Sequence, residues 1–168
     1  MQVRFIKQFG DRYRFECVRG DGSVTSADLE TRSYLKHDLM HYVIEKNAKL
    51  ENSFFATVKK GKNLEELSPK AMKAAANAQA TPGGSLWPLA PSEINATEII
   101  AAALQGIGDK SADFPEIVSR ISEYLELQNL PTPAYLTPDF CKSAVAEHRS
   151  LMERWRNLRA GSVLELAF

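Results

Sequence analysis

The chain has 168 residues, which is long enough to bury a substantial core and is typical of a single domain. Hydrophobic residues make up 44% of the sequence and charged residues 25%, which are ordinary values for a globular protein. The 21 basic and 21 acidic residues cancel, so the net charge argues against binding to nucleic acids or to an anionic membrane.

Two cysteines are too few for a disulfide framework, so Cys17 and Cys141 are predicted to be reduced thiols. The first residues alternate between polar and apolar types and lack the basic and apolar regions of a signal peptide. No stretch approaches the roughly 18 apolar residues that a transmembrane helix needs. We therefore expect a soluble, cytoplasmic protein.

The N-terminal residues predict an antiparallel hairpin. Apolar and polar side chains alternate over residues 2–9 and again over residues 12–19, as in strands with one packed and one solvated face. Residues 10–11 (Gly-Asp) form a two-residue turn of the glycine-first type between them. A second glycine-rich turn, over residues 20–23, is expected to lead into a short strand near residues 23–27.

Residues 34–45 predict an amphipathic central helix that carries two of the three histidines. At about 100° per residue, His37, His41 and Glu45 share one stripe, with Asp38 beside it. Aliphatic residues occupy most of the opposite side. We expect the aliphatic side to be buried and the histidine stripe to face solvent or a cleft.

Histidines four residues apart on a helix can hold a metal ion, and here they occur in the order His-Asp-x-x-His. The pattern resembles the His-Glu-x-x-His motif of zinc metalloproteases, in which the histidines bind zinc and the glutamate is the general base. This resemblance makes His37 and His41 candidate ligands of zinc or another divalent metal. Asp38, whose arm is one methylene shorter than that of glutamate, or Glu45 is then the candidate catalytic base.

A stable zinc site normally closes with at least a third ligand. His148 is the only other histidine, on a later predicted helix, and we expect it to approach the pair across a cleft. Glu147 is the nearest carboxylate alternative. Without a metal, Asp38 would favour the positive end of the helix dipole, and the other polar residues would line a solvated face.

Beyond the central helix, residues 53–58 are β-branched and aromatic enough to predict a strand or a tight hydrophobic segment. An alanine-rich helix that opens on a Ser-Pro pair is predicted over residues 68–80. Residues 81–92 contain three prolines and two glycines and predict a loop between two halves of the chain. Trp87 in this loop indicates that it docks on the body or covers a site as a flap.

Three later helices are predicted from their start signals. Asn95 and Asp113 are each followed three residues on by a glutamate, as in a capping box, and Thr137 precedes a proline. The helix that opens at Thr137 is expected to run toward Arg159. The last residues, 163–168, alternate like a strand that could pair with the N-terminal hairpin.

These elements predict an α+β fold. A small antiparallel sheet, made of the N-terminal hairpin and the C-terminal strand, packs against the central helix and several later helices. We expect a single domain over residues 1–168. Its parts are the hairpin with the central helix, the Pro/Gly loop, the helical half and the C-terminal strand, over residues 1–62, 81–92, 93–160 and 162–168.

The central helix also carries the pattern Lys-His-Asp-Leu-x-His-Tyr-x-Ile-Glu over residues 36–45, followed by Phe-Phe-x-x-Val-x-x-Gly over residues 54–61. Both segments resemble a group of small uncharacterised bacterial proteins with a His-Asp-Leu-x-His-aromatic-x-aliphatic-Glu segment after an N-terminal hairpin. The ending Trp-x-x-Leu-x-x-Gly-x-x-Leu-x-Leu, over residues 155–166, is similar to theirs. The resemblance covers about the first 62 and the last 20 residues. It implies a shared fold and no particular activity.

Two classes of function follow from these patterns. The first is a metal-binding protein, in its enzymatic form a metal-dependent hydrolase, centred on His37 and His41. The second is a non-enzymatic module that binds a small molecule or a protein partner through the Trp87 loop and the helical half. Near-stoichiometric metal in protein purified without a histidine tag is expected only for the first class.

Overall fold

The computed structural model describes residues 1–67, 92–107 and 112–168. The predicted alanine-rich helix over residues 68–80 lies outside the described residues. So does the predicted loop over residues 81–92 with Trp87, apart from Ser92, where a helix begins. Within the described ranges, no helix is both long enough and apolar enough to cross a membrane.

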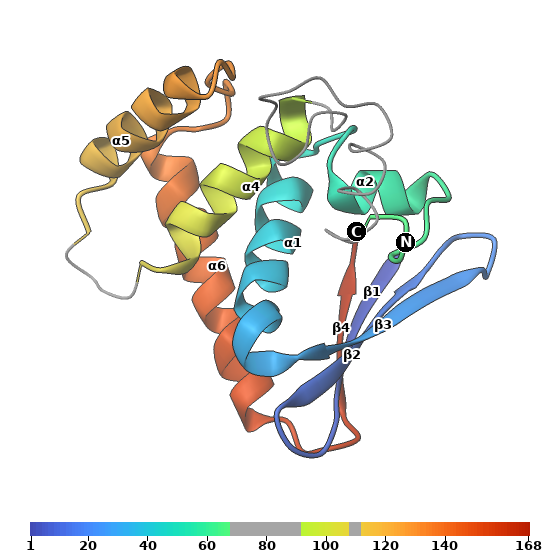
Figure 1. Ribbon diagram of the computed structural model, residues 1–168. Coiled ribbons are helices and arrows are strands. Elements are labelled where there is room, and N and C mark those ends of the chain that lie inside the picture. Colours follow the sequence, from blue (N-terminus) through green and yellow to red (C-terminus); the bar gives the residue numbers. More distant parts are fainter. Residues whose placement is uncertain (68–91, 108–111) are drawn as a thin grey trace.

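Four antiparallel strands form one sheet in the order β3-β2-β1-β4, as Figure 1 shows. The predicted α+β fold, with its N-terminal hairpin and C-terminal strand, is confirmed. The third strand is longer than predicted and runs to residue 30. The strands are β1 (Gln2–Lys7), β2 (Arg12–Val18), β3 (Val24–Glu30) and β4 (Val163–Ala167).

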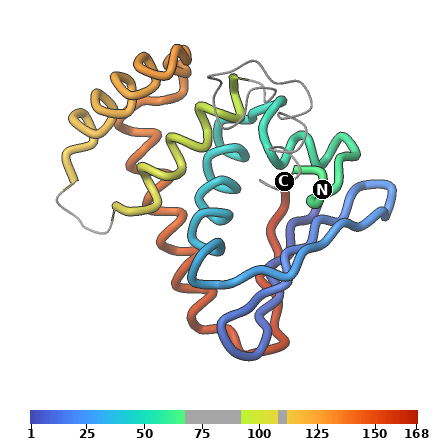
Figure 2. The backbone as a smooth tube through the Cα atoms, viewed as in Figure 1, coloured from blue at the N-terminus to red at the C-terminus, as the bar shows by residue number. Residues whose placement is uncertain are grey.

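Pairing of β1 with β4 places the two ends of the chain side by side, as the tube in Figure 2 shows. The amino group of Met1 donates a hydrogen bond of 2.9 Å to the carbonyl oxygen of Phe168. β1 is therefore an inner strand, paired with β2 along one side and with β4 along the other.

The sheet has one apolar and one polar face, as the period-two alternation of its strands requires. On the polar face, Arg4 of β1 lies 3.4 Å from Glu16 of β2 and 2.7 Å from Glu165 of β4. On the other face, Phe5 pairs in register with Phe15 and Leu164. The buried apolar residues of these three strands are Val3, Phe5, Tyr13, Phe15, Cys17, Leu164 and Leu166.

Helices cover the apolar face. A π-helical segment, Thr31–Leu35, leads from β3 directly into α1 (Lys36–Ala48). The other described helices are α2 (Phe54–Lys59), α4 (Ser92–Gln105), α5 (Phe114–Leu127) and α6 (Pro138–Asn157).

The segment after α1 forms the helix α2. Of the two alternatives predicted for residues 53–58, a strand or a tight hydrophobic segment, the strand is therefore wrong. Phe55 and Val58, three residues apart, are both fully buried and lie on the same side of α2. The strand preference of β-branched and aromatic residues depends on context, and here packing in the core overrides it.

The start signals of the last two helices are confirmed. The Asp113 carboxylate accepts a hydrogen bond from the backbone N–H of Glu116, and the Thr137 hydroxyl accepts one from that of Phe140. α4 begins at Ser92, three residues before the predicted start at Asn95.

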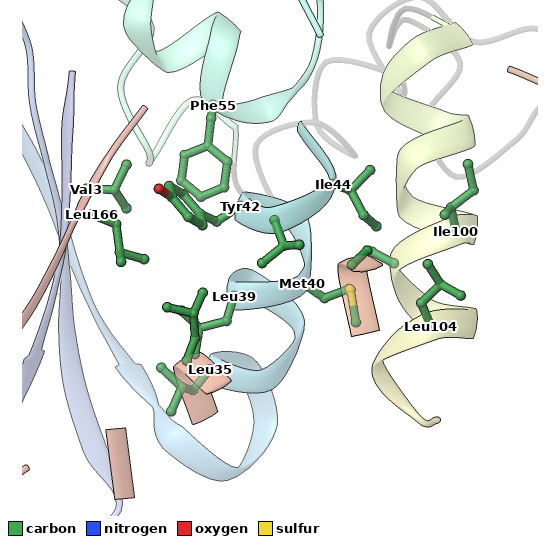
Figure 3. Close-up of a cluster of buried hydrophobic side chains, with 14 of the residues drawn as sticks. Val3, Leu35, Leu39, Met40, Tyr42, Ile44, Phe55, Ile100, Leu104 and Leu166 are labelled. Atoms are coloured by element: carbon green, nitrogen blue, oxygen red, sulfur yellow. The ribbon is translucent and has the colours of Figure 1, made fainter. Parts of the chain in front are cut away.

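α1 lies at the centre of the molecule, between the sheet on one side and α4 and α6 on the other (Figure 1). In Figure 3, Tyr42 points toward Phe55 and the sheet, whereas Ile44 points toward Ile100 of α4. Every residue of α1 from 39 to 45 is buried. His41 and Glu45 of the histidine stripe are therefore buried, and His37 is partly exposed. Of the two predicted surroundings of the stripe, solvent or a cleft, the structure has a cavity lined by His37 and His41.

The packing of β4 predicts that shortening a buried side chain lowers the free energy of unfolding far more than shortening its exposed neighbour. Leu164 is 2% exposed and its neighbour Val163 is 43% exposed. We expect Leu164→Ala to lower the free energy of unfolding by about 2–5 kcal/mol because it opens a cavity in the core. Val163→Ala, the matched control, should cost about 1 kcal/mol or less. Urea unfolding measures both values, and equal costs would contradict the burial of β4.

Candidate metal centre

Two histidines of α1 face one glutamate of α4. His37 Nε2 lies 3.2 Å from Glu98 Oε2, and His41 Nε2 lies 3.4 Å from Glu98 Oε1. One potential ligand atom from each residue lies within 4.8 Å of the other two. Within the described ranges of the chain, this His-His-Glu cluster is the one group of three or more His, Cys, Asp or Glu side chains that could hold a metal ion.

The three side chains of the cluster are close enough together to share one metal ion. Zinc binds imidazole nitrogen and carboxylate oxygen at about 2.0–2.1 Å, which puts neighbouring ligand atoms of a tetrahedron about 3.4 Å apart. The two nitrogen–oxygen distances, 3.2 and 3.4 Å, run to different oxygens of Glu98, and one potential ligand atom from each residue lies within 4.8 Å of the other two. The two imidazole rings lie 4.5 Å apart between centroids and are inclined by 61°, so they are not stacked face to face.

The buried carboxylate of Glu45 contacts the ring nitrogen of His41 that does not face Glu98. His41 Nδ1 lies 3.1 Å from Glu45 Oε1, and Glu45 Oε2 accepts a 2.7 Å hydrogen bond from the backbone N–H of Phe55. Because an ionised carboxylate only accepts hydrogen bonds, this contact places a proton on Nδ1. Such a carboxylate partner fixes the tautomer and orientation of metal-binding histidines.

The other ring nitrogen of His41 has no hydrogen-bond partner among the described residues, although it is buried. His41 is only 4% exposed, and its Nε2 faces Glu98. The 3.4 Å contact with the Glu98 carboxylate is an ion pair and not a hydrogen bond, whereas the great majority of buried polar atoms in native proteins are hydrogen-bonded. A metal ion between the three side chains would satisfy this nitrogen.

The electrostatics of the cluster favour a positive charge. Burial alone would lower the pKa of His41, but the carboxylates of Glu45 and Glu98 outweigh it and raise that pKa to about 10. Burial opposes ionisation of Glu98, yet its contacts with His37 and His41 hold the pKa of Glu98 well below its usual range. The site therefore suits either a proton on His41 or a metal cation.

Asp38 lies beside the cluster and lines the same cavity as the two histidines. Its carboxylate accepts a hydrogen bond from the Tyr13 hydroxyl of β2. Burial raises the pKa of Asp38, although the bond from Tyr13 acts in the opposite direction. Asp38 is thus a positioned carboxylate with a stronger affinity for a proton than an ordinary aspartate.

A cavity of about 370 Å³ opens at the cluster. Its polar residues are His37, Asp38, His41, Glu65 and Glu98, together with Tyr34. The rest of the described lining is apolar and comes from β2, β3, α2, the turn after α2, and α4: Phe15, Ala27, Leu29, Phe54, Phe55, Leu64, Leu67 and Ile94.

His148, the predicted third ligand, does not join the histidine pair. Its Nε2 donates a 2.9 Å hydrogen bond to the carbonyl oxygen of Lys36, and burial lowers the pKa of His148. The alternative ligand, Glu147, accepts from Lys46 and Asn47 instead. Glu98 supplies the third side chain because α4, and not α6, lies over the histidine stripe.

Glu45, a predicted catalytic base, lies at Nδ1 of His41, whereas the possible metal position lies at Nε2. The structure thus gives Glu45 an orienting contact and leaves Asp38 as the candidate base. Sequence reasoning missed Glu98 because it attributed that residue to a capping box with Asn95. The start of α4 at Ser92 removes that explanation, since Glu98 then lies beyond the first turn.

No protein-family model, curated protein sequence or solved structure matches this chain. The resemblance to small bacterial proteins with a His-Asp-Leu-x-His segment stays a prediction. The chemistry of the site must therefore be argued from its own geometry.

The buried bonds of Glu45 generate a stability prediction. In Glu45→Gln, the amide oxygen can accept from either His41 or Phe55, but the NH₂ group then faces the other donor. Leaving one buried donor unsatisfied should lower the free energy of unfolding by about 1–3 kcal/mol. The matched control, Glu147→Gln, alters a partly exposed pair and should cost about 0–1 kcal/mol. Equal unfolding free energies for Glu45→Gln and the wild type in urea would refute the orienting contact.

Proposed function

We propose that this chain binds a divalent metal, preferentially zinc, through His37, His41 and Glu98, and that it uses the metal for hydrolysis. The observation that carries the proposal is the state of His41. Its Nδ1 is held by Glu45, while its buried Nε2 faces Glu98 without a hydrogen-bond partner among the described residues. This is the arrangement of a metal ligand with its supporting carboxylate.

The ligand set favours a catalytic role over a structural one. Structural zinc sites usually have four protein ligands, whereas catalytic sites have three and leave a position for water or substrate. Two histidines and one glutamate are the catalytic ligands in thermolysin and carboxypeptidase A. The adjoining cavity offers space in which a substrate can reach the metal.

Asp38 is the proposed general base. A divalent metal held by His37, His41 and Glu98 would supply Lewis acidity to a carbonyl substrate. The oxygen of the attacking water bonds to the carbonyl carbon, and its proton passes to Asp38. The carbon–oxygen or carbon–nitrogen bond then breaks, and the proton passes from Asp38 to the leaving group. Burial supports this role because it raises the pKa of Asp38 toward the working pH.

A second candidate function is supported by the apolar lining of the cavity. A small-molecule binding module needs a mostly apolar pocket with a few polar groups that fix the orientation of the ligand. In that case the His-His-Glu cluster would be a partly buried ion-pair network that orients the ligand without turnover. Metal content and catalytic turnover separate the two candidates.

The first test is the metal content of protein purified without a histidine tag. We expect about one zinc per chain by elemental analysis, with strongly reduced zinc in His37→Asn and Glu98→Gln, because each removes a ligand. Glu45→Gln should weaken zinc binding about 10–100-fold, as loss of a supporting carboxylate does.

The matched controls are variants of the two residues that the sequence alone predicted as the third metal ligand, Glu147 and His148. Glu147→Gln and His148→Gln remove the same kinds of side chain from α6, outside the cluster, and should leave zinc stoichiometry unchanged. Zinc content well below one per chain after loading, or loss of zinc in His148→Gln with retention in Glu98→Gln, would refute the proposed site.

The second test concerns turnover of a panel of activated esters and amides by the zinc-loaded protein. Asp38→Asn should lower kcat by about 10²–10⁴-fold while zinc content stays the same, because it removes the proton acceptor and no metal ligand. Asp28→Asn, on the far side of the sheet, is the matched control and should retain activity. No turnover by the wild type, or equal rates for Asp38→Asn, would leave the binding module as the better description.

A further inference from the structure

The cavity beside the cluster is asymmetric in polarity. Potential metal ligands come from α1 and α4, whereas apolar side chains from the sheet and α2 form much of the remaining wall. A volume of about 370 Å³ falls within the range of small-molecule sites. One compound could therefore place a polar head at the cluster and an apolar body against the sheet.

A small residue on β3 creates the room for this apolar body. Ala27 pairs in register with Phe15 of β2, and Leu29 pairs with Tyr13. The β2 members of both pairs are buried, whereas Ala27 and Leu29 are only partly buried. Apolar surface that is left open in a concave site is a feature of ligand-binding grooves.

The charges around the cavity restrict the chemistry of its occupant. Its described lining contains Asp38, Glu65 and Glu98 but no lysine or arginine. A carboxylate or phosphate placed against the sheet, away from the two histidines, would lose its hydration without gaining a cationic partner from the described lining. An uncharged apolar group meets no such cost.

We propose that the cavity binds the apolar acyl group of an uncharged ester or amide substrate, with the carbonyl at the His-His-Glu cluster. This inference rests on the proposed function and adds the substrate class to it. Ala27 is the residue that determines how large an acyl group is accepted. Short polar acyl groups and acyl groups with a terminal carboxylate are poor ligands of the same site.

Alkyl hydroxamic acids provide the test with the zinc-loaded protein, because their head group binds zinc and their chain length can be varied. Titration calorimetry from acetohydroxamic to octanohydroxamic acid should show about fourfold tighter binding for each added methylene until the cavity is full. A hydroxamate with a terminal carboxylate should bind more weakly than the alkyl compound of equal length. Zinc-dependent binding that is independent of chain length would overturn the inference and leave the metal site intact.

Two variants test whether the space beside Ala27 causes the dependence of binding on chain length. Ala27→Phe should remove the chain-length dependence while acetohydroxamic acid still binds, since the added ring fills the cavity and no ligand is changed. Ser26→Phe, the matched control, adds the same ring on the opposite face of β3 and should keep the dependence. A similar loss in both variants would count against Ala27 as the determinant. If Ala27→Phe does not fold, the wild-type protein still tests the inference through the comparison of the carboxylate-terminated hydroxamate with the alkyl hydroxamate of equal length.

A zinc-independent arm separates failure of the metal proposal from failure of this inference. In the presence of a chelator, the amide protons of Ala27 and Leu29 should shift in NMR spectra on addition of hexanamide and not of acetamide. If zinc does not bind but hexanamide gives these shifts, the proposed hydrolase is wrong and the apolar acyl site stands. If zinc does not bind and hexanamide gives no shifts, the inference is overturned as well.

Discussion

The enclosure of α1 is the constraint on which the rest of the structure depends. A helix with a sheet on one side and two helices on the other has little solvated surface for polar side chains. Buried polar groups must then find partners inside the protein. Glu45 meets this requirement, because its carboxylate contacts both the His41 imidazole and the backbone N–H of Phe55. The two contacts orient the imidazole and anchor the start of α2. A stability requirement and the geometry of the proposed metal centre thus have the same physical origin.

Under the proposed function, the same enclosure would strengthen the effect of the cluster on a substrate. Charges in a poorly hydrated site interact more strongly than they do in water, so fixed groups such as Glu98 and Asp38 exert large effects. Tyr13 from the sheet and Glu45 from α1 hold the groups next to the cavity in place. The sheet is therefore more than a platform for the helices, because β2 supports Asp38 and β3 forms part of the cavity wall.

The amino-acid sequence predicted the sheet well, since alternation along a strand depends only on near neighbours. The caps at Asp113 and Thr137 were predictable for the same reason. α2 was misread because packing, and not local preference, decides its conformation. Glu98 could not be found, since its contact with His37 spans 61 positions and depends on which helix covers α1. His148 was the natural choice by residue type, but its nitrogen satisfies the carbonyl of Lys36 instead.

The pairing of β1 with β4 has a consequence for how the protein folds. β1 comes first in the chain, yet its pairing is complete only when residues 163–167 have arrived. Contacts between such distant segments have a high entropic cost before they stabilise anything, and they slow folding. Until then β1 has an open edge of unpaired backbone groups beside apolar side chains, which invites pairing with another chain. During synthesis, the edge of β1 therefore stays unpaired until residues 163–167 have been made.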